Sequence, residues 1–276
     1  MRQFVCLTVV LAVAATTWAQ DWEGDVLPVD NDLHGTFGVT YDSQYVWRGF
    51  DVFANRSAVH VVADLNLFNS GFGISAVGHR ANSSGFEANE RWDSTLYYQN
   101  GLFQGGPGAT NFRLGWVYYA YPHRNSGESI DLQEGHAILS WPSLLPIKGL
   151  CPSYVLVKTW PARSDSILPE AASGFLHILM LDYGFTVPGV LPNIPEHLIR
   201  LHGEIIYNDG VTLDTLGRFP NPDHGWSNGV LGVSTDLNLG SSITLTPGLF
   251  YQARLEDTIN DTSDDMWFSL GLTYSF

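Results

Sequence analysis

The chain has 276 residues, 45% of them hydrophobic and 13% aromatic, and its 28 acidic against 13 basic residues give a formal net charge of -15 at pH 7. Such an acidic surface repels phosphate groups, so we expect no nucleic-acid partner. After the N-terminal segment no apolar run reaches the roughly 18 residues of a membrane-spanning helix, so only a barrel could cross a membrane.

The first 19 residues have the pattern of a secretory signal. Arg2 precedes an apolar run from Phe4 to Ala15, and Thr17-Trp18-Ala19 places small residues at the positions that a signal peptidase reads. We expect an exported mature chain of residues 20–276. Loss of Cys6 with the signal leaves Cys151 alone, so no intrachain disulfide is expected.

The rest of the chain alternates apolar with polar or small residues in about twelve segments, which is typical of strands in an all-β protein. We predict one domain, a transmembrane antiparallel up-and-down β-barrel of about 12 strands. The predicted strands cover residues 35–48, 58–68, 71–80, 90–98, 111–121, 131–141, 152–160, 174–185, 197–208, 228–239, 243–254 and 265–276.

The connections sort into two kinds. Long polar connections are predicted to be the outer loops, and they cover residues 42–57, 121–130, 161–173, 209–227 and 256–265. Short turns near residues 69–71 and 239–242 are expected on the periplasmic side. The Gly- and Pro-rich connections 99–110 and 185–196 are exceptions, because they are long for that side.

The first predicted strand carries aromatic residues on one face. Phe37, Val39 and Tyr41 would face lipid, and we expect Tyr45 and Trp47 to lie at the outer membrane interface on the same face. The opposite face would turn Asp42, Gln44 and Arg48 towards the lumen.

The segment Ser43-Gln-Tyr45-Val-Trp-Arg48-Gly49 resembles the Ser-x-Tyr-x-x-Arg-Gly signature near the mature N-terminus of a family of bacterial outer-membrane porins of unknown substrate, the TorF type. The resemblance implies an outer-membrane channel, and it implies no reaction. Arg48 could bind an anionic solute or pair with a carboxylate such as Asp42 or Asp64. We favour the wall-bracing pair, because a polar barrel interior needs internal partners.

The same parity predicts the pore lumen on the other strands. A charge on the lipid face would cost about 2–4 kcal/mol near the midplane, so the charged side chains should share the inner face. The predicted lumen residues are Asp42, Gln44, Arg48, His60, Asp64, Arg91, Asp93, Glu134, His136, Arg200, His202 and Glu204. Acids outnumber arginines in this set, which favours weak cation preference. The segment 174–185 departs from the pattern, because both of its faces are apolar.

Chemistry at these side chains is not expected. Glu134-x-His136 and His202-x-Glu204 could hold a metal only if their strands approached each other across the barrel, and such clusters more often form wall networks. We expect no metal, cofactor or catalytic residue, and no His-x-Ser pair supports a lipid-interface enzyme. The acidic outer loops, including residues 257–265, are candidates for divalent cations that bridge to lipopolysaccharide.

The last nine residues alternate without a break and end on an aromatic. Large residues share one face, Phe268, Leu270, Leu272, Tyr274 and Phe276, and this ending resembles the assembly signal of bacterial outer-membrane barrels. The alternative is the last strand of a soluble sandwich.

The resulting functional hypothesis is a narrow, porin-like channel in the bacterial outer membrane, without enzymatic activity. Its partners would be outer-membrane lipid, the barrel-assembly machinery and small solutes. The alternative is a non-conducting barrel whose loops bind a partner or anchor the envelope, and a lipid-interface enzyme is less favoured. Twelve strands lie between barrels filled by side chains and wide porins, so a narrow pore is expected.

Overall fold

The computed structural model describes residues 33–68, 70–124, 129–163, 166, 173–191, 194–211, 224–240, 242–259 and 264–276. The predicted signal, residues 1–19, lies outside these residues and stays a prediction. No helix within the described ranges is long and apolar enough to cross a membrane.

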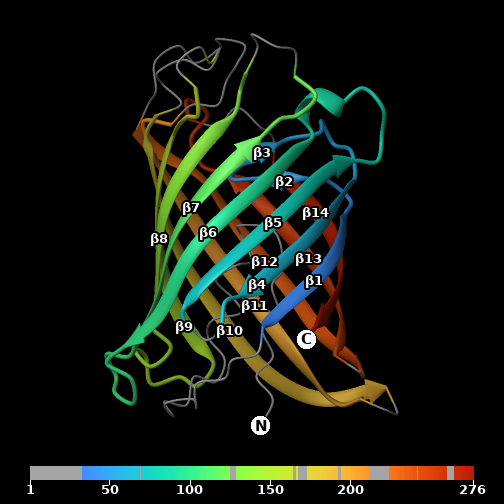
Figure 1. The fold of residues 1–276 in the computed structure, drawn as a ribbon. Helices are drawn as coiled ribbons and strands as arrows, with labels where there is room; N and C mark the ends of the chain where they lie inside the picture. Colours follow the sequence, from blue (N-terminus) through green and yellow to red (C-terminus); the bar gives the residue numbers. More distant parts are fainter. Residues whose placement is uncertain are drawn as a thin grey trace.

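Twelve strands of the described chain form one closed antiparallel barrel, in which each strand pairs with its neighbours in barrel order and the first closes on the last (Figure 1). This confirms the predicted fold. The strands are β1 (His34–Asp42), β4 (Ala58–Asn66), β5 (Phe72–Ala81), β6 (Arg91–Leu102), β7 (Thr110–Ala120), β8 (Leu132–Ser140), β9 (Leu150–Pro161), β10 (Phe175–Leu191), β11 (Ile194–Asp209), β12 (His224–Gly240), β13 (Ile243–Arg254) and β14 (Asp265–Ser275).

The alternation of the sequence becomes an apolar exterior. On β14 the even-numbered residues are exposed and the odd-numbered ones buried, from Asp265 to Thr273. Phe37 on β1 and Leu96 on β6 are likewise about half exposed, at 51% and 50%. Exposed apolar side chains on most strands of a closed sheet are the pattern of a barrel whose outside faces lipid.

The connections alternate between the two ends of the barrel, with residues 43–57 at one end and the short connection between β4 and β5 at the other (Figure 1). The two exceptional connections are shorter than expected, because the strands continue into them. β6 runs to Leu102, and β10 and β11 extend to Leu191 and Ile194. Their hairpin projects past the other turns at the lower right of Figure 1.

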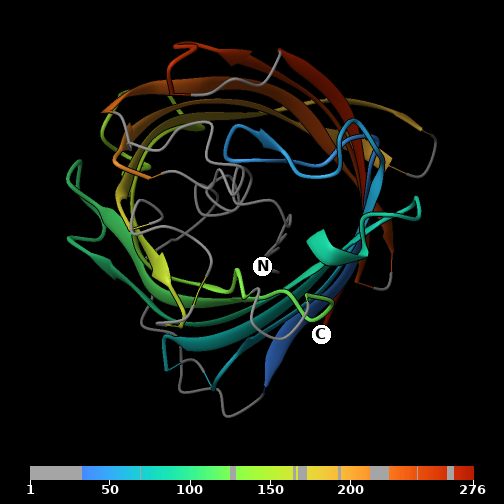
Figure 2. The same ribbon diagram turned by 90° about the horizontal axis from the view of Figure 1, so that it is seen from above.

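The first strand differs from its prediction. β1 ends at Asp42 rather than at residue 48, and the chain then forms a small hairpin of β2 (Val46–Trp47) and β3 (Phe50–Asp51). Its two turn residues both have positive φ, 50° at Arg48 and 93° at Gly49, as the tight turn of a two-residue hairpin requires. Figure 2 shows this hairpin inside the ring of strands. A single 3-10 turn in the described chain, η2 (Glu87–Asn89), precedes β6.

Candidate functional site

Residues 43–53 form a crossbar inside the loop end of the barrel. On one side Tyr45, Trp47 and Phe53 pack into a buried cluster with residues of β4, β5, β7 and β8, including Tyr119 and Leu132. On the other side Val46 packs with Val230, Phe250 and Trp267 of β12, β13 and β14. Because β8 and β13 stand five places apart in the ring of twelve strands, the crossbar contacts two well-separated walls.

The positions of Tyr45 and Trp47 correct the sequence prediction. Both were expected at the lipid interface, and their side chains are instead buried, with 1% and 4% exposed. The inward turn after Asp42 is the reason, since it takes both rings off the outer face of β1. The guanidinium groups of Arg91 and Arg48 lie over the Trp47 ring, 4.3 and 4.9 Å from its centroid.

Arg48 ties the crossbar to β8. Its Nη2 donates to Oε2 of Glu134 at 2.6 Å, and the Tyr119 hydroxyl donates to the same oxygen at 2.6 Å. His136 Nδ1 lies 3.1 Å from the other carboxylate oxygen. Arg48 therefore pairs with a wall carboxylate, as favoured from the sequence. The partner is Glu134 and not Asp42 or Asp64, because the inward turn carries Arg48 away from β1.

The four fixed positions of the Ser-x-Tyr-x-x-Arg-Gly segment all make contacts that hold the crossbar against the barrel wall. The Ser43 hydroxyl accepts a hydrogen bond from the Phe268 amide at 2.9 Å, and the Tyr45 hydroxyl accepts one from Arg91 at 3.0 Å. Arg48 makes the ion pair, and Gly49 takes the positive φ while its carbonyl accepts from Gln252 at 3.2 Å. The segment therefore encodes an inward hairpin rather than an outer strand end.

Below the crossbar a chain of close polar contacts crosses four strands. Asp42 Oδ2 lies 3.1 Å from His60, whose Nδ1 lies 2.8 Å from Nδ1 of His79. His79 Nε2 is 3.0 Å from Asp93, and Arg91 donates to Asp93 at 2.6 Å. Sequence reasoning missed His79, although it stands directly opposite His60 in the ladder and shares its inward parity.

A second cluster lies on β10 to β13. His202 Nδ1 is 2.7 Å from Asp182, and its Nε2 is 3.5 Å from Glu204. Arg200 forms an ion pair with Asp236, which also accepts from Thr246 at 2.8 Å. Sequence reasoning omitted Asp182, because its strand is apolar on both faces, and also Asp236.

Of the twelve predicted lumen residues, Gln44 and Arg48 lie in the crossbar itself, and the other ten lie on barrel strands, where most belong to the clusters described above. Gln44 is buried, and Asp64 accepts a hydrogen bond from the Tyr97 hydroxyl at 2.8 Å. Glu134 and His136 on β8 are not gathered with His202 and Glu204 on β11, and no group of three metal-ligating side chains occurs within the described ranges. Whether these residues line a conducting pore stays a prediction.

Part of the inner wall from β8 to β11 is apolar. It consists of a cluster of buried residues, Ile138, Val155, Val157, Leu176, Ile178, Met180, Ile206 and Val211. This explains why the segment 174–185 is apolar on both faces, since Phe175, Leu179 and Leu181 are exposed on the outside.

The large C-terminal residues lie on the outer face of the barrel. Phe268, Leu270, Leu272, Tyr274 and Phe276 face outward with exposed fractions between 37% and 48%. The Phe276 ring stacks on Phe37 of β1 at 5.4 Å, so the last residue also covers the seam where the barrel closes. Its role as an assembly signal stays a prediction.

Comparisons with known proteins give distant structural similarities. No protein-family model and no curated protein matches the chain. It is similar to the structure of a KdgM porin in complex with disordered oligogalacturonate (TM-score 0.48, 10% identity, 88% of this chain and 99% of that one). It is also similar to a NanC porin (0.48, 11%, 89% and 100%) and to LpxR from Salmonella typhimurium (0.48, 9%, 87% and 100%).

At such identities these similarities do not define what the chain transports or catalyses. The architecture rests on the strand pairing itself, a closed barrel with an apolar outer band. Because only a closed sheet satisfies every backbone group in lipid without a helix, this is the architecture of an outer-membrane barrel.

Proposed function

We propose that this protein is a porin-like channel of the bacterial outer membrane that passes small solutes through a bore narrowed by the crossbar. The observation that supports the proposal most strongly is the crossbar itself, an 11-residue segment folded into a closed barrel whose inner face carries paired charges of both signs. A protein that needed only a filled, inert interior would have little use for so many ionisable groups there.

The role of the Ser-x-Tyr-x-x-Arg-Gly segment supports membership of the TorF-type porin family. Its four fixed residues hold the crossbar in place, so the signature would specify the constriction of the channel rather than a strand. No reaction follows from this resemblance. The partners of four buried histidines, His60, His79, His136 and His202, are histidine or carboxylate side chains, which favours a wall network over a serine hydrolase.

The second candidate is a non-conducting barrel that binds a partner or anchors the envelope through its outer loops. The dense packing of Tyr45, Trp47 and Phe53 under the loops favours this reading, because large buried rings exclude water from part of the bore. The acidic loop after Arg254, where Asp257 is exposed, is the candidate position for divalent cations that bridge to lipopolysaccharide.

Conductance in planar lipid bilayers separates the two candidates. We expect discrete small channels from the refolded protein, and a conductance larger by about twofold or more when residues 44–53 are replaced by a Gly/Ser linker. The matched control replaces residues 142–148, a turn at the other end whose Leu144 and Ile147 are exposed, and should leave conductance unchanged. Silent bilayers with both the native protein and the linker variant would favour the non-conducting barrel.

A further inference from the structure

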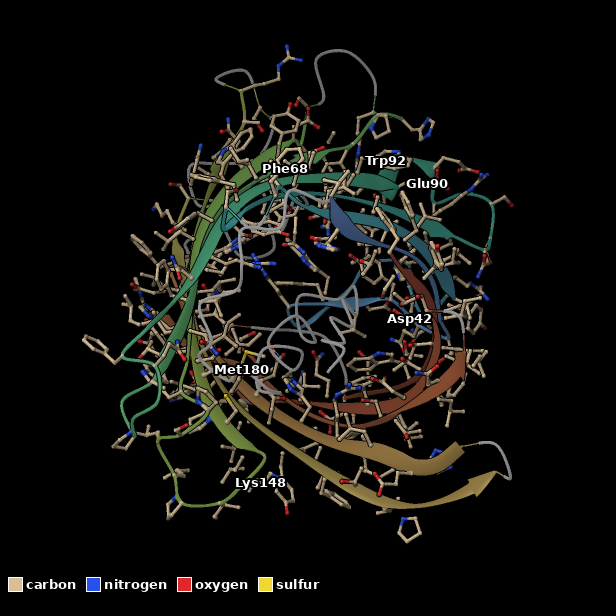
Figure 3. All side chains as sticks on the ribbon, turned by 60° about the horizontal axis from the view of Figure 1, so that its bottom comes forward. Asp42, Phe68, Glu90, Trp92, Lys148 and Met180 are labelled. Carbon is tan, nitrogen blue, oxygen red and sulfur yellow. The ribbon has the colours of Figure 1, made fainter. Side chains whose placement is uncertain are left out.

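The inner surface of the barrel has two unlike walls. From Thr36 to Thr40 on β1 and from Ser269 to Thr273 on β14 the inward residues are all short, Thr36, Gly38, Thr40, Ser269, Gly271 and Thr273. The facing wall, β8 to β11, carries the apolar cluster of Ile, Leu, Val and Met side chains. Figure 3 shows Asp42 of the first wall and Met180 of the second on facing sides of the ring. Short side chains leave more of the barrel radius to a solute than branched apolar ones do.

Each of the four arginines described inside the barrel already has a side-chain partner. Arg48 pairs with Glu134, Arg91 with Asp93 and Arg200 with Asp236. Arg113 donates to Gln99 and lies 3.8 Å from the centroid of the Tyr97 ring, whose hydroxyl donates to Asp64. The inner acids exceed these four arginines, since Asp42, Asp182, Glu204 and Asp265 have no arginine among the contacts described for them.

Three carboxylates on the short-side-chain wall and on the adjoining strand β4 also have an oxygen without a hydrogen-bond partner among the described residues. These are Oδ2 of Asp265, Oδ1 of Asp42 and Oδ2 of Asp64, on side chains that are at most 6% exposed. They belong to β14, β1 and β4, which are adjacent, and the ladder places Asp42 opposite Ser269 and Asp64 opposite Thr36. The three carboxylates therefore follow one another from the loop end towards the turn end.

We propose that this wall is a cation path, along which small organic cations with N–H donors, alkylammonium or guanidinium ions, are passed between Asp265, Asp42 and Asp64. A buried carboxylate oxygen without a donor is costly, and an ammonium or guanidinium group supplies both donors and opposite charge. The hydroxyl groups of Thr36, Thr40 and Ser269 can replace part of the hydration shell between the acids. The proposal rests on the proposed channel function.

Arg48 supports the alternative hypothesis, a path for anions. Its Nε and Nη1 atoms have no hydrogen-bond partner among the described residues, although Nη2 is held by Glu134. One guanidinium with two unpaired nitrogen atoms lies at the crossbar, whereas three carboxylates with an unpaired oxygen lie on adjacent strands, so the balance of unpaired groups favours cations.

Reversal potentials in a salt gradient test the cation path. With potassium chloride or guanidinium chloride the native channel should prefer the cation, and guanidinium should permeate at least as well as potassium. Asp42→Asn, Asp64→Asn and Asp265→Asn should each lower the cation-to-anion permeability ratio by about twofold or more. The matched control, Asp182→Asn, removes the same charge from the facing wall, where Oδ2 is also without a partner, and should change the ratio much less.

The outcomes distinguish the two proposals. Channels whose selectivity responds equally to all four substitutions, or is anionic and reversed by Arg48→Met, would overturn the cation path and leave the channel function standing. A protein that forms no channels at all would remove both.

A second measurement does not depend on removing a native acid. In a Cys151→Ser background, Thr40→Cys should react faster with a cationic than with an anionic methanethiosulfonate reagent of similar size. Equal rates would contradict the cation path.

Discussion

Arg48 combines two unfavourable features that its contacts offset. Its φ of 50° lies in the left-handed region, and its side chain is withdrawn from water with only 4% exposed. Glu134, which is fully buried, supplies the opposite charge at 2.6 Å, and Trp47 supplies a ring face. The ion pair therefore holds a strained turn in place, which is a structural role that a surface arginine could not have.

Replacement of Arg48 by Met should destabilise the barrel by about 3 kcal/mol, because it leaves the buried carboxylate of Glu134 without its counter-charge. Urea unfolding followed on semi-native gels would measure the loss, and Arg48→Met combined with Glu134→Leu should recover much of it. Arg80→Met is the matched control, since Arg80 pairs with Glu90 from a side chain that is 78% exposed. Equal losses at Arg48 and Arg80 would show that the crossbar is not anchored by this pair.

At the residue scale, the sequence predicted that Arg48 pairs with a carboxylate, but it did not predict which carboxylate or where the pair lies. Tyr45 and Trp47 continue the alternation of β1, and a period of two alone cannot show that a chain leaves its sheet. The available signal was the Arg48-Gly49 pair between two short segments with aromatic residues, which is compatible with a tight hairpin turn. The partner of Arg48 could not be predicted, because Glu134 is brought near only by the closure of the barrel.

At the scale of elements the strands were largely predictable, since lipid outside and polar groups inside force strict alternation. β13 runs from Ile243 to Arg254, as expected. β10 was the difficult strand, because Leu176, Ile178 and Met180 are understood only together with Val155 and Ile138 on neighbouring strands. The difference between the two inner walls therefore depends on the register between strands, which cannot be predicted from any single segment.

β14 carries the element-scale prediction. Tyr274→Asp with Phe276→Asp should sharply reduce the amount of assembled barrel in the membrane, because it puts two charges on the lipid-facing seam beside Phe37. Heat-modifiable protein in isolated outer membranes measures assembly. The control, Thr273→Asn, makes a polar change on the inward face of the same strand and should assemble normally. Normal assembly of the double variant would show that the C-terminal rings are dispensable.

At the scale of the whole molecule, closure of the sheet determines how the protein resists detergent and how it unfolds. Twelve ladders join the strands of the described chain into a ring without a free edge, so each strand is hydrogen-bonded on both sides over most of its length. A sheet of this kind exposes few backbone groups to detergent and must break several ladders together to unfold.

We therefore expect the refolded mature protein to migrate faster on cold SDS gels when it is left unheated than when it is boiled, because the intact barrel is more compact than the unfolded chain. A sample unfolded in urea but never boiled is the control and should migrate with the boiled protein. The exposed rings on the outside, such as Phe37 and Phe268, should also make the folded protein depend on detergent or lipid for solubility. Identical mobility in both states, together with solubility in plain buffer, would indicate a secreted soluble β-protein instead.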